Sequence, residues 1–335
     1  MTSTPEHLRR ACLVINAGAG QILSTGPETV EHMAREALGD EVRIIMAAPE
    51  HIQKALETAF GDEQYDTVIA GGGDGTVASA GKLALHHGKT LGVLPLGTMN
   101  LFARALGMPQ ALAEAFPAIR TTRPALVDVA EVNGELFFNH MSVGLHARMI
   151  RLRERMSYTG RLTKILGSLL ALRRAVAGAP LRRISVKAGA SRPRRFRSAL
   201  TVVTVNPVPD RAGQLPFRPG QDHGRMGCYM YAREGVSDIA VLLADLAAGN
   251  WSQNTNLEFL EATRIKLDSA RQMHASLDGE VRLLKPPLRL GIRPKALRAL
   301  TVDYSGDQGE GASGEMMRSS DNDVSTQPRD STDSW

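Results

Sequence analysis

The segment GGGDGTV, residues 71–77, places four glycines and one carboxylate in seven residues, directly after the apolar run YDTVIA. Ordering a glycine costs more backbone entropy than ordering any other residue, so the cluster indicates a backbone that must approach something closely. Glycines let backbone N–H groups come near an anion, and a following helix points its positive end at the same place. We expect that helix to start near Thr76 or Val77, with a phosphate group as the natural ligand.

Asp74 is the one charged residue of this loop. It would repel a bare phosphate, so it predicts either an intervening Mg²⁺ or a substrate hydroxyl whose proton it accepts. The alternative is a tight strand-to-helix turn with Asp74 as the helix N-cap, which is the more common role of an isolated GGxG run. The spacing excludes a P-loop, because Leu83 follows Lys82 where Ser or Thr is needed, and a dinucleotide fingerprint, because Thr76 stands at the third glycine.

Two further loops have a similar composition. PLGTMN, residues 95–100, ends another strand-like run and is followed by Arg104 about one turn into a predicted helix, and NAGAG, residues 16–20, follows ACLVI. Between them, short β-rich runs alternate with amphipathic helical stretches, which is typical of βαβ units on a parallel sheet. Ligands of such sheets bind at the carboxyl ends of the strands, so the three loops are expected to line one edge.

From about Leu126 the sequence changes to shorter β-like pieces. VNGE at 132–135 and LDGE at 277–280 have the composition of hairpin turns, so this half predicts an antiparallel β-sandwich. We expect an α/β domain at 8–125, completed by a returning strand at about 297–304, and a β-sandwich domain at 126–296. The chain has 335 residues, for which two domains are a fair expectation.

Composition limits the location and the partners. The start of the chain lacks the apolar stretch of a signal peptide and no run of eighteen apolar residues occurs, so the cytoplasm is expected. Cys12 and Cys228 lie in apolar runs that fit reduced core thiols. The tail at 305–335 has the composition of a disordered segment.

Positive charge is concentrated in one stretch. Residues 148–197 hold fifteen Lys or Arg and one acid, Glu154. Within it, 148–183 is a basic amphipathic insertion that predicts contact with an anionic membrane surface, or equally a helix packed on the sandwich with a solvated basic face. Aromatic residues make up 4% of the chain and no recognition motif occurs, so nucleic acid is not expected as a partner.

NAGAG, GGGDGTV, PLGTMNLFAR and LDGE, in this order, resemble the pattern of the diacylglycerol kinase catalytic-domain family, which includes bacterial lipid kinases, sphingosine kinases and ceramide kinases. The resemblance spans about residues 10–303. It implies an α/β nucleotide domain similar to that of NAD kinases and phosphofructokinases, a β-sandwich domain, and ATP with Mg²⁺ in the cleft. The residues that it places around the triphosphate are Asn16, Gly18, Gly20, Gly72, Gly73, Asp74, Gly75, Thr76, Gly97, Thr98 and Asn100.

The resemblance also implies where the acceptor hydroxyl is activated. In LDGE, Asp278 to Glu280, it makes Glu280 the favoured proton acceptor, with Asp74 as a rival base. Asn139, Ser142 and Gly144 form a family-like FxNxxSxG core expected at the acceptor site. Several bacterial relatives carry an Asp of an accessory Mg²⁺ site directly before a glycine; here His223 holds that position and Asp222 is displaced by one, which puts this metal in doubt.

The leading hypothesis is an ATP- and Mg²⁺-dependent lipid kinase at the inner face of the membrane, with diacylglycerol as the first candidate acceptor and phosphatidic acid as product. A ceramide or sphingoid-base kinase of the same family is the alternative acceptor assignment. A soluble small-molecule kinase similar to NAD kinases is a second enzyme hypothesis. A nucleotide-binding regulator without catalysis is the hypothesis from another class.

Overall fold

The computed structural model describes residues 5–154, 182–208, 223–232 and 253–302, together with Val241, Asp245, Ala248 and Asn250. Two sheets organise this part of the chain. One has ten strands in the order β2-β1-β3-β4-β16-β13-β8-β9, with β5 paired to β16 and β6 paired to β5. The other has six strands in the order β12-β11-β10-β7-β14-β15.

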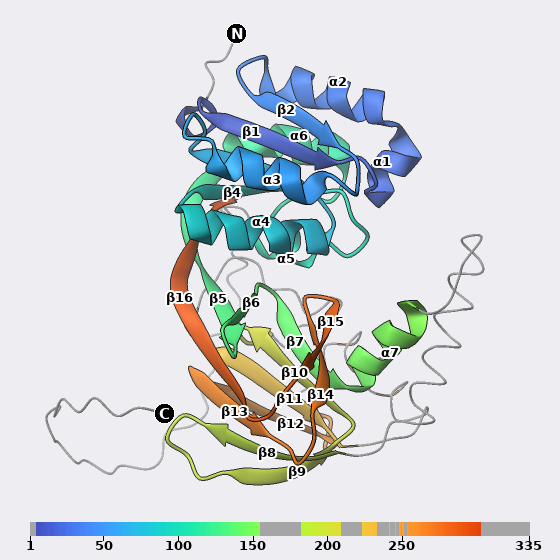
Figure 1. Ribbon diagram of the computed structural model, residues 1–335, viewed down its shortest axis with the longest axis vertical. Coiled ribbons are helices and arrows are strands. Elements are labelled where there is room, and N and C mark those ends of the chain that lie inside the picture. The colour runs from blue at the N-terminus through green and yellow to red at the C-terminus, as the bar shows by residue number, and fades with distance from the viewer. Residues whose placement is uncertain are drawn as a thin grey trace, which may run out of the picture. The chain divides into compact units, whose positions relative to one another are not determined.

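The first four strands are parallel neighbours with nearly continuous apolar sequences, as strands covered on both faces require. They are β1 (Ala11–Asn16), β2 (Arg43–Ala47), β3 (Thr67–Gly72) and β4 (Thr90–Pro95). Helices α3 and α4 pack together on one face of these strands, and α2 and α6 on the other (Figure 1). The predicted βαβ series is therefore present.

The helices of this part follow the strands along the chain. Pro27 stands in the first turn of α2, and Gly39 ends that helix with a φ of 78°, a conformation that favours glycine. The helices are η1 (Glu6–Leu8), α1 (Gly20–Thr25), α2 (Pro27–Leu38), α3 (Ile52–Gly61), α4 (Asp74–His87), α5 (Leu101–Ala105) and α6 (Leu112–Thr121).

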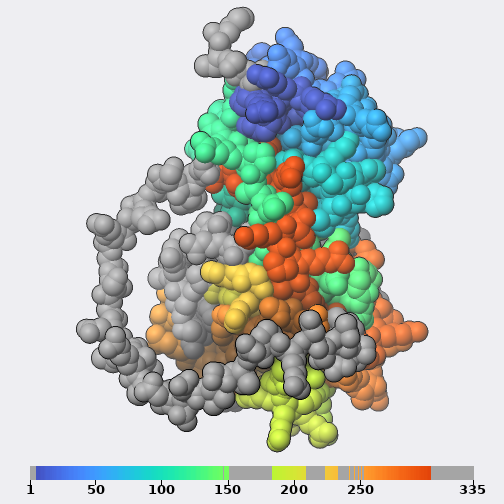
Figure 2. Space-filling model, turned by 90° about the vertical axis from the view of Figure 1, so that its left-hand side faces the viewer, coloured from blue at the N-terminus to red at the C-terminus, as the bar shows by residue number. Residues whose placement is uncertain are grey.

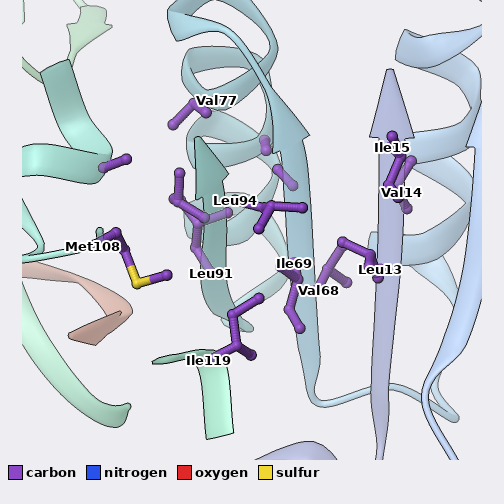
Figure 3. Close-up of a cluster of buried hydrophobic side chains, with 14 of the residues drawn as sticks. Leu13, Val14, Ile15, Val68, Ile69, Val77, Leu91, Leu94, Met108 and Ile119 are labelled. Carbon is purple, nitrogen blue, oxygen red and sulfur yellow. The ribbon is translucent and has the colours of Figure 1, made fainter. Parts of the chain in front are cut away.

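A first hydrophobic core fills the space between these strands and helices. Figure 3 shows its centre, where side chains of β1, β3 and β4 meet those of α4 and α6. Burial of such side chains stabilises each by about 1.5–3 kcal/mol relative to an exposed position. The residues labelled there are Leu13, Val14, Ile15, Val68, Ile69, Val77, Leu91, Leu94, Met108 and Ile119.

Two long antiparallel strands join this core to a second one. They are β5 (Arg123–Val132) and β16 (Leu288–Thr301). The end of β16 pairs with β4, at Ala299 opposite Leu91, whereas its beginning pairs with β13. The register of β16 against β5 shifts between Arg293 and Leu297. The ten-stranded sheet is therefore continuous between the two cores, and the domain boundaries drawn from the sequence stay predictions.

The second core lies between the far half of the ten-stranded sheet and the six-stranded sheet, so the predicted β-sandwich is confirmed. Val186, Leu267 and Leu290 enter it from one sheet, and Met141 and Val203 from the other. The elements are β6 (Glu135–Phe137), β7 (His140–Gly144), α7 (Leu145–Glu154), β8 (Arg182–Ala188), β9 (Arg194–Ser198), β10 (Leu200–Val205), β11 (Met226–Tyr231), β12 (Leu257–Ala262), β13 (Arg264–Asp268), β14 (Met273–Leu277) and β15 (Glu280–Leu284).

Both predicted hairpin turns are present. Asn133 and Gly134 join β5 to β6, and Asp278 and Gly279 join β14 to β15, in each case with φ between 47° and 98°. Two successive positive φ values characterise the type I′ turn, which matches the twist of the flanking strands.

The predictions for the two cysteines, the basic insertion, the tail and membrane spans can be compared with the structure one by one. Cys12 and Cys228 are free and buried, as predicted, and burial raises their pKa values to about 11 and about 12. Residues 155–181 of the basic insertion and the tail at 305–335 lie outside the described residues. Within the part of the chain that the structure describes, no helix has the length and hydropathy to cross a bilayer.

Candidate active site

The three glycine-bearing loops lie at one edge of the parallel strands. Ile15 of β1 is level with Gly71 of β3, and Gly72 is level with Pro95 of β4. Because neighbouring parallel strands end at the same edge, NAGAG, GGGDGT and PLGTMN meet there. The structure thus brings together the residues predicted to surround a triphosphate.

The second and third loops touch through their backbones. A Cβ placed on Gly97 would lie 2.5 Å from the Cα of Gly73, and one placed on Gly72 would lie 2.5 Å from the Cβ of Thr76. Glycine is therefore needed at 97 because the two loops pack against each other, and at 72 because its own loop folds back onto Thr76. Gly20 and Gly75 have open space at the Cβ position, so ligand approach remains the explanation there.

Two asparagine side chains hold the shape of the loops. The Nδ2 of Asn16 donates to the Thr76 Oγ1 over 3.1 Å, and its Oδ1 accepts from the Gly18 N–H over 2.9 Å. Asn100, with a φ of 50°, accepts from the Gly97 N–H over 2.8 Å and donates to the Gly97 carbonyl over 2.9 Å. Both amides are used by the loops themselves, whereas Thr98 is exposed.

Asp74 differs from the sequence prediction in two ways. Helix α4 begins at Asp74, earlier than Thr76 or Val77, and its N-cap is Gly73. The Asp74 Oδ1 instead accepts from the backbone N–H of Leu101 over 2.7 Å, at the start of α5. Burial raises the pKa of Asp74, and backbone hydrogen bonds to residues 100–102 oppose that shift in part. The carboxylate therefore joins the GGGDGT loop to the PLGTMN loop.

Asp278 is more deeply buried than Asp74. It is 8% exposed and accepts three backbone hydrogen bonds, from Phe138 over 2.7 Å, Asn139 over 2.8 Å and His140 over 3.1 Å. Burial raises its pKa to about 6, the three N–H groups oppose that shift, and the charge of Asp74 adds to it. The carboxylates of GGGDGT and LDGE thus lie close enough to influence each other.

Phe138 contacts both the Asp278 turn and helix α5, whose first residue binds Asp74. It is not among the site residues predicted from the sequence. Its N–H donates to Asp278, while its ring lies edge-to-face on Phe102 of α5, with centroids 5.8 Å apart. A Cβ on Gly81 of α4 would lie 2.6 Å from the same ring. In the sequence, Phe138 is visible only as one of two phenylalanines before Asn139. Such an apolar pair looks the same whether it supports a functional site or packs in an ordinary core.

Glu280, favoured from the sequence as the proton acceptor, lies on the surface. Its side chain is 50% exposed and pairs with Arg282, with 3.1 Å between Oε2 and the guanidinium. The same guanidinium contacts Glu135 over 3.1 Å. The buried member of the LDGE turn is therefore Asp278.

The residues predicted for the acceptor site separate into two groups. Asn139 is half-buried and donates its N–H to Asp278, so it lies beside the carboxylates. Ser142 is fully buried in β7 opposite Ser276 of β14. Gly144 has a φ of 91°, and a Cβ there would lie 2.3 Å from the Ala199 carbonyl oxygen, so it shapes the turn from β7 into α7.

The accessory metal gains no support from the described residues. Asp222 lies outside them, and among them no group of three or more His, Cys, Asp or Glu side chains could hold a metal ion. The N–H of His223 donates to Asn206 over 3.0 Å, and the N–H of Gly224 donates to buried Asp128 over 2.8 Å. Asp128 also accepts from the N–H of Lys295 over 2.8 Å, so protein groups join these segments directly.

Comparison with known proteins identifies residues 10–132 as a match to the diacylglycerol kinase catalytic domain. A protein of Klebsiella pneumoniae named "Probable lipid kinase YegS-like" is 35% identical over 139 residues, which are 40% of this chain and 45% of that protein. A diacylglycerol kinase of Bacillus subtilis is 25% identical over 224 residues, or 65% of this chain and 72% of that protein. The match thus spans less than half of the Klebsiella relative.

A solved structure has the same fold. The crystal structure of a diacylglycerol kinase from Bacillus anthracis superposes with a TM-score of 0.61 and 18% identity, covering 88% of this chain and 97% of that one. This confirms the predicted fold class, an α/β part followed by an antiparallel β-sandwich.

The pKa of Asp278 predicts a pH dependence of stability. Its folded-state pKa, about 6, is above the unfolded value of 3.8, so the folded state binds the proton more tightly. The resulting stabilisation is present below the unfolded pKa and is lost as the pH rises through about 6. In Asp278→Asn this loss is absent, so between about pH 4 and pH 7 the free energy of unfolding of wild type should fall by about 2 kcal/mol relative to the variant. Denaturant titrations across this range measure it, and parallel pH profiles would contradict the assignment.

The contact between Gly81 and Phe138 predicts a stability effect. In Gly81→Ala the new methyl group displaces the ring, and we expect a loss of about 1–3 kcal/mol in the free energy of unfolding. Gly61→Ala is the matched control, because Gly61 is also helical and its Cβ position is open, so its stability should stay equal or rise slightly. Equal effects of the two substitutions on the urea midpoint would exclude the proposed packing role.

Proposed function

We propose that the chain is an ATP-dependent lipid kinase that transfers the γ-phosphate to a lipid hydroxyl, because residues 10–132 match the diacylglycerol kinase catalytic domain. Diacylglycerol, giving phosphatidic acid, is the acceptor that we place first, in line with the name of the Bacillus subtilis relative. Ceramide and sphingoid bases are the alternative acceptors. One observation carries the proposal. Three glycine-bearing loops lie together at the site with two carboxylates, Asp74 and Asp278, and the charge of Asp74 raises the pKa of Asp278.

The loops supply what a triphosphate needs. Backbone N–H groups of GGGDGT open α4, a helix of fourteen residues whose N-terminal end favours negative charge. The side chains of Asn16, Asn100 and Asp74 already hold the loops by hydrogen bonds, so little reorganisation is needed on binding. Such preorganised donors are the main source of rate enhancement in phosphoryl transfer.

Asp278 is the residue that we assign as the general base. In the transfer, the acceptor oxygen forms a bond to the γ-phosphorus, the bond from that phosphorus to the bridging oxygen breaks, and ADP leaves. The hydroxyl proton passes to the carboxylate. Three of the roughly four lone-pair positions of Asp278 are occupied by N–H donors, two on Oδ1 and one on Oδ2, which leaves Oδ2 one position for this proton. A pKa of about 6 suits proton transfer near neutrality.

Mg²⁺, when bound with ATP, supplies charge neutralisation at the phosphates. Magnesium is commonly held through one or two carboxylates, waters and the phosphates themselves, so the absence of a three-ligand cluster among the described residues agrees with a nucleotide-borne ion. Asp74 is the carboxylate of the loops that fits this role. Its Oδ1 is oriented by the hydrogen bond from Leu101, and the carboxylate would hold a water of such an ion.

The test is transfer of labelled γ-phosphate from ATP into mixed micelles that present diacylglycerol, ceramide or sphingosine. We expect a labelled lipid with wild type, a loss of kcat of about a hundredfold or more in Asp278→Asn, and little change in the KM for ATP. Glu280→Gln is the matched control and should retain activity, because Glu280 is exposed and paired with Arg282.

Two results would redirect the proposal. If Glu280→Gln loses kcat while Asp278→Asn keeps it, the base is Glu280, as the sequence resemblance implied. If no lipid is labelled by protein that binds ATP, the chain is a soluble small-molecule kinase or a nucleotide-binding regulator.

A further inference from the structure

One face of the ten-stranded sheet is cationic. In β8, β9, β13 and the beginning of β16, side chains alternate between the second core and the opposite face, as strand geometry requires. The opposite face carries seven cations, six of them exposed and Lys266 half-buried, and one acid, Asp268. We call it the cationic sheet face; its cations are Arg183, Lys187, Arg195, Arg197, Arg264, Lys266 and Arg289.

The strand register sets like charges directly opposite one another on this face. Arg183 of β8 is paired with Arg197 of β9. Lys187 of β8 is paired with Lys266 of β13, which is in turn paired with Arg289 of β16. Like charges directly across an antiparallel pair destabilise a sheet, and here they form a row across three adjacent strands about 4.8 Å apart.

Two acids lie near this face. Asp268 lies 3.8 Å from Lys266, and Arg194, which belongs to the other side of β9, lies 3.6 Å from Glu258. Further along β16, Arg293 pairs with Glu131, which marks the end of the face. By residue count, the outward positions described on these closely spaced strands hold seven cations and one acid.

A sheet that keeps such a row against its own stability is suited to an external anion that offsets the repulsion. We propose that the cationic sheet face docks the protein on an anionic lipid bilayer, whose headgroups present many phosphates in one plane. This proposal rests on the proposed lipid-kinase function, which requires the protein to reach an acceptor held in a membrane. Lys and Arg side chains near such a surface are attracted to it within about 8 Å at physiological salt.

The chemistry of the face favours a bilayer over a nucleic acid. Single-stranded nucleic acids are bound with the help of aromatic side chains on which bases stack, and the outward positions of β8 and β9 hold none. Phe196 lies opposite Ile184 on the other side of the hairpin, where it packs against the second core. The β8–β9 segment, yellow-green in Figure 2, is at the surface of the molecule.

The cationic sheet face is a different surface from the basic insertion 148–183, which the sequence predicts to contact an anionic membrane. That insertion overlaps the face only at Arg183, and its residues 155–181 lie outside the described part of the chain. The strands of the face come from segments that are far apart in the sequence. No contiguous amphipathic pattern therefore predicts it.

The test is co-sedimentation of the full chain with vesicles of phosphatidylcholine alone and of phosphatidylcholine mixed with phosphatidylglycerol. The face variant is Lys187→Glu combined with Arg197→Glu, which turns two like-charge pairs into opposite-charge pairs. Arg9→Glu combined with Lys54→Glu is the control, because both residues are exposed, lie in the α/β part and change the net charge equally. We expect wild type and control to bind anionic vesicles and the face variant to bind about 30-fold more weakly or worse.

Thermal unfolding supplies a readout that a merely structural role would not give. The face variant should unfold at the same or a higher temperature than wild type, because each new glutamate faces a cation. Weaker binding together with equal or greater stability supports docking. A face variant that binds as wild type does, that loses binding no more than the control, or that loses binding only because it is unfolded would overturn the proposal.

Two further outcomes separate this inference from the proposed function. If wild type labels lipid in neutral micelles but ignores anionic vesicles, docking by this face is wrong and the kinase assignment stands. If wild type binds the vesicles through this face and labels no lipid, docking by this face is correct and the kinase assignment is wrong. Selective loss of RNA binding in the face variant, with no vesicle binding by wild type, would identify a nucleic-acid surface instead.

Discussion

The hydrogen bonds from three successive backbone N–H groups to the Asp278 carboxylate hold the site together. They fix the turn between β14 and β15 against the link between β6 and β7. They also set the direction of Phe138, whose ring then reaches Phe102 and Gly81 in the α/β part. The same three bonds thus position the candidate base and hold the Phe138 ring in the first core. Burial of Asp278 also raises its pKa, so position and proton affinity have the same origin.

The loops at the edge of the parallel strands are stabilised from within. Asn16 joins the first loop to the second, and Asp74 joins the second to the helix that follows the third. Asn100 closes the third loop on itself. These bonds join protein groups only, and they orient the backbone donors of the loops. Groups that look like ligand contacts in a motif therefore contribute to catalysis first by fixing geometry.

The sequence was informative wherever a pattern has a local cause. Alternating strand and helix runs predicted the parallel strands, and Asn-Gly and Asp-Gly predicted both hairpin turns, because positive φ is a property of the turn itself. The sequence was uninformative where the role of a residue depends on whether its side chain is buried. Asp278 and Glu280 are two residues apart in one turn, yet one is buried and the other pairs with Arg282 on the surface. The opposition of Lys187, Lys266 and Arg289 depends on register between distant segments, which no local pattern contains.

Strand β16 also has a consequence for how the chain acquires its structure. It is the last described element to be synthesised, and both cores need it: Leu288 and Leu290 belong to one and Leu297 and Ala299 to the other. A ribosome-bound chain that lacks this strand has two incomplete cores and exposed edges on β4 and β13. Neither core is complete before β16 is synthesised, so a truncation before residue 288 leaves both cores incomplete.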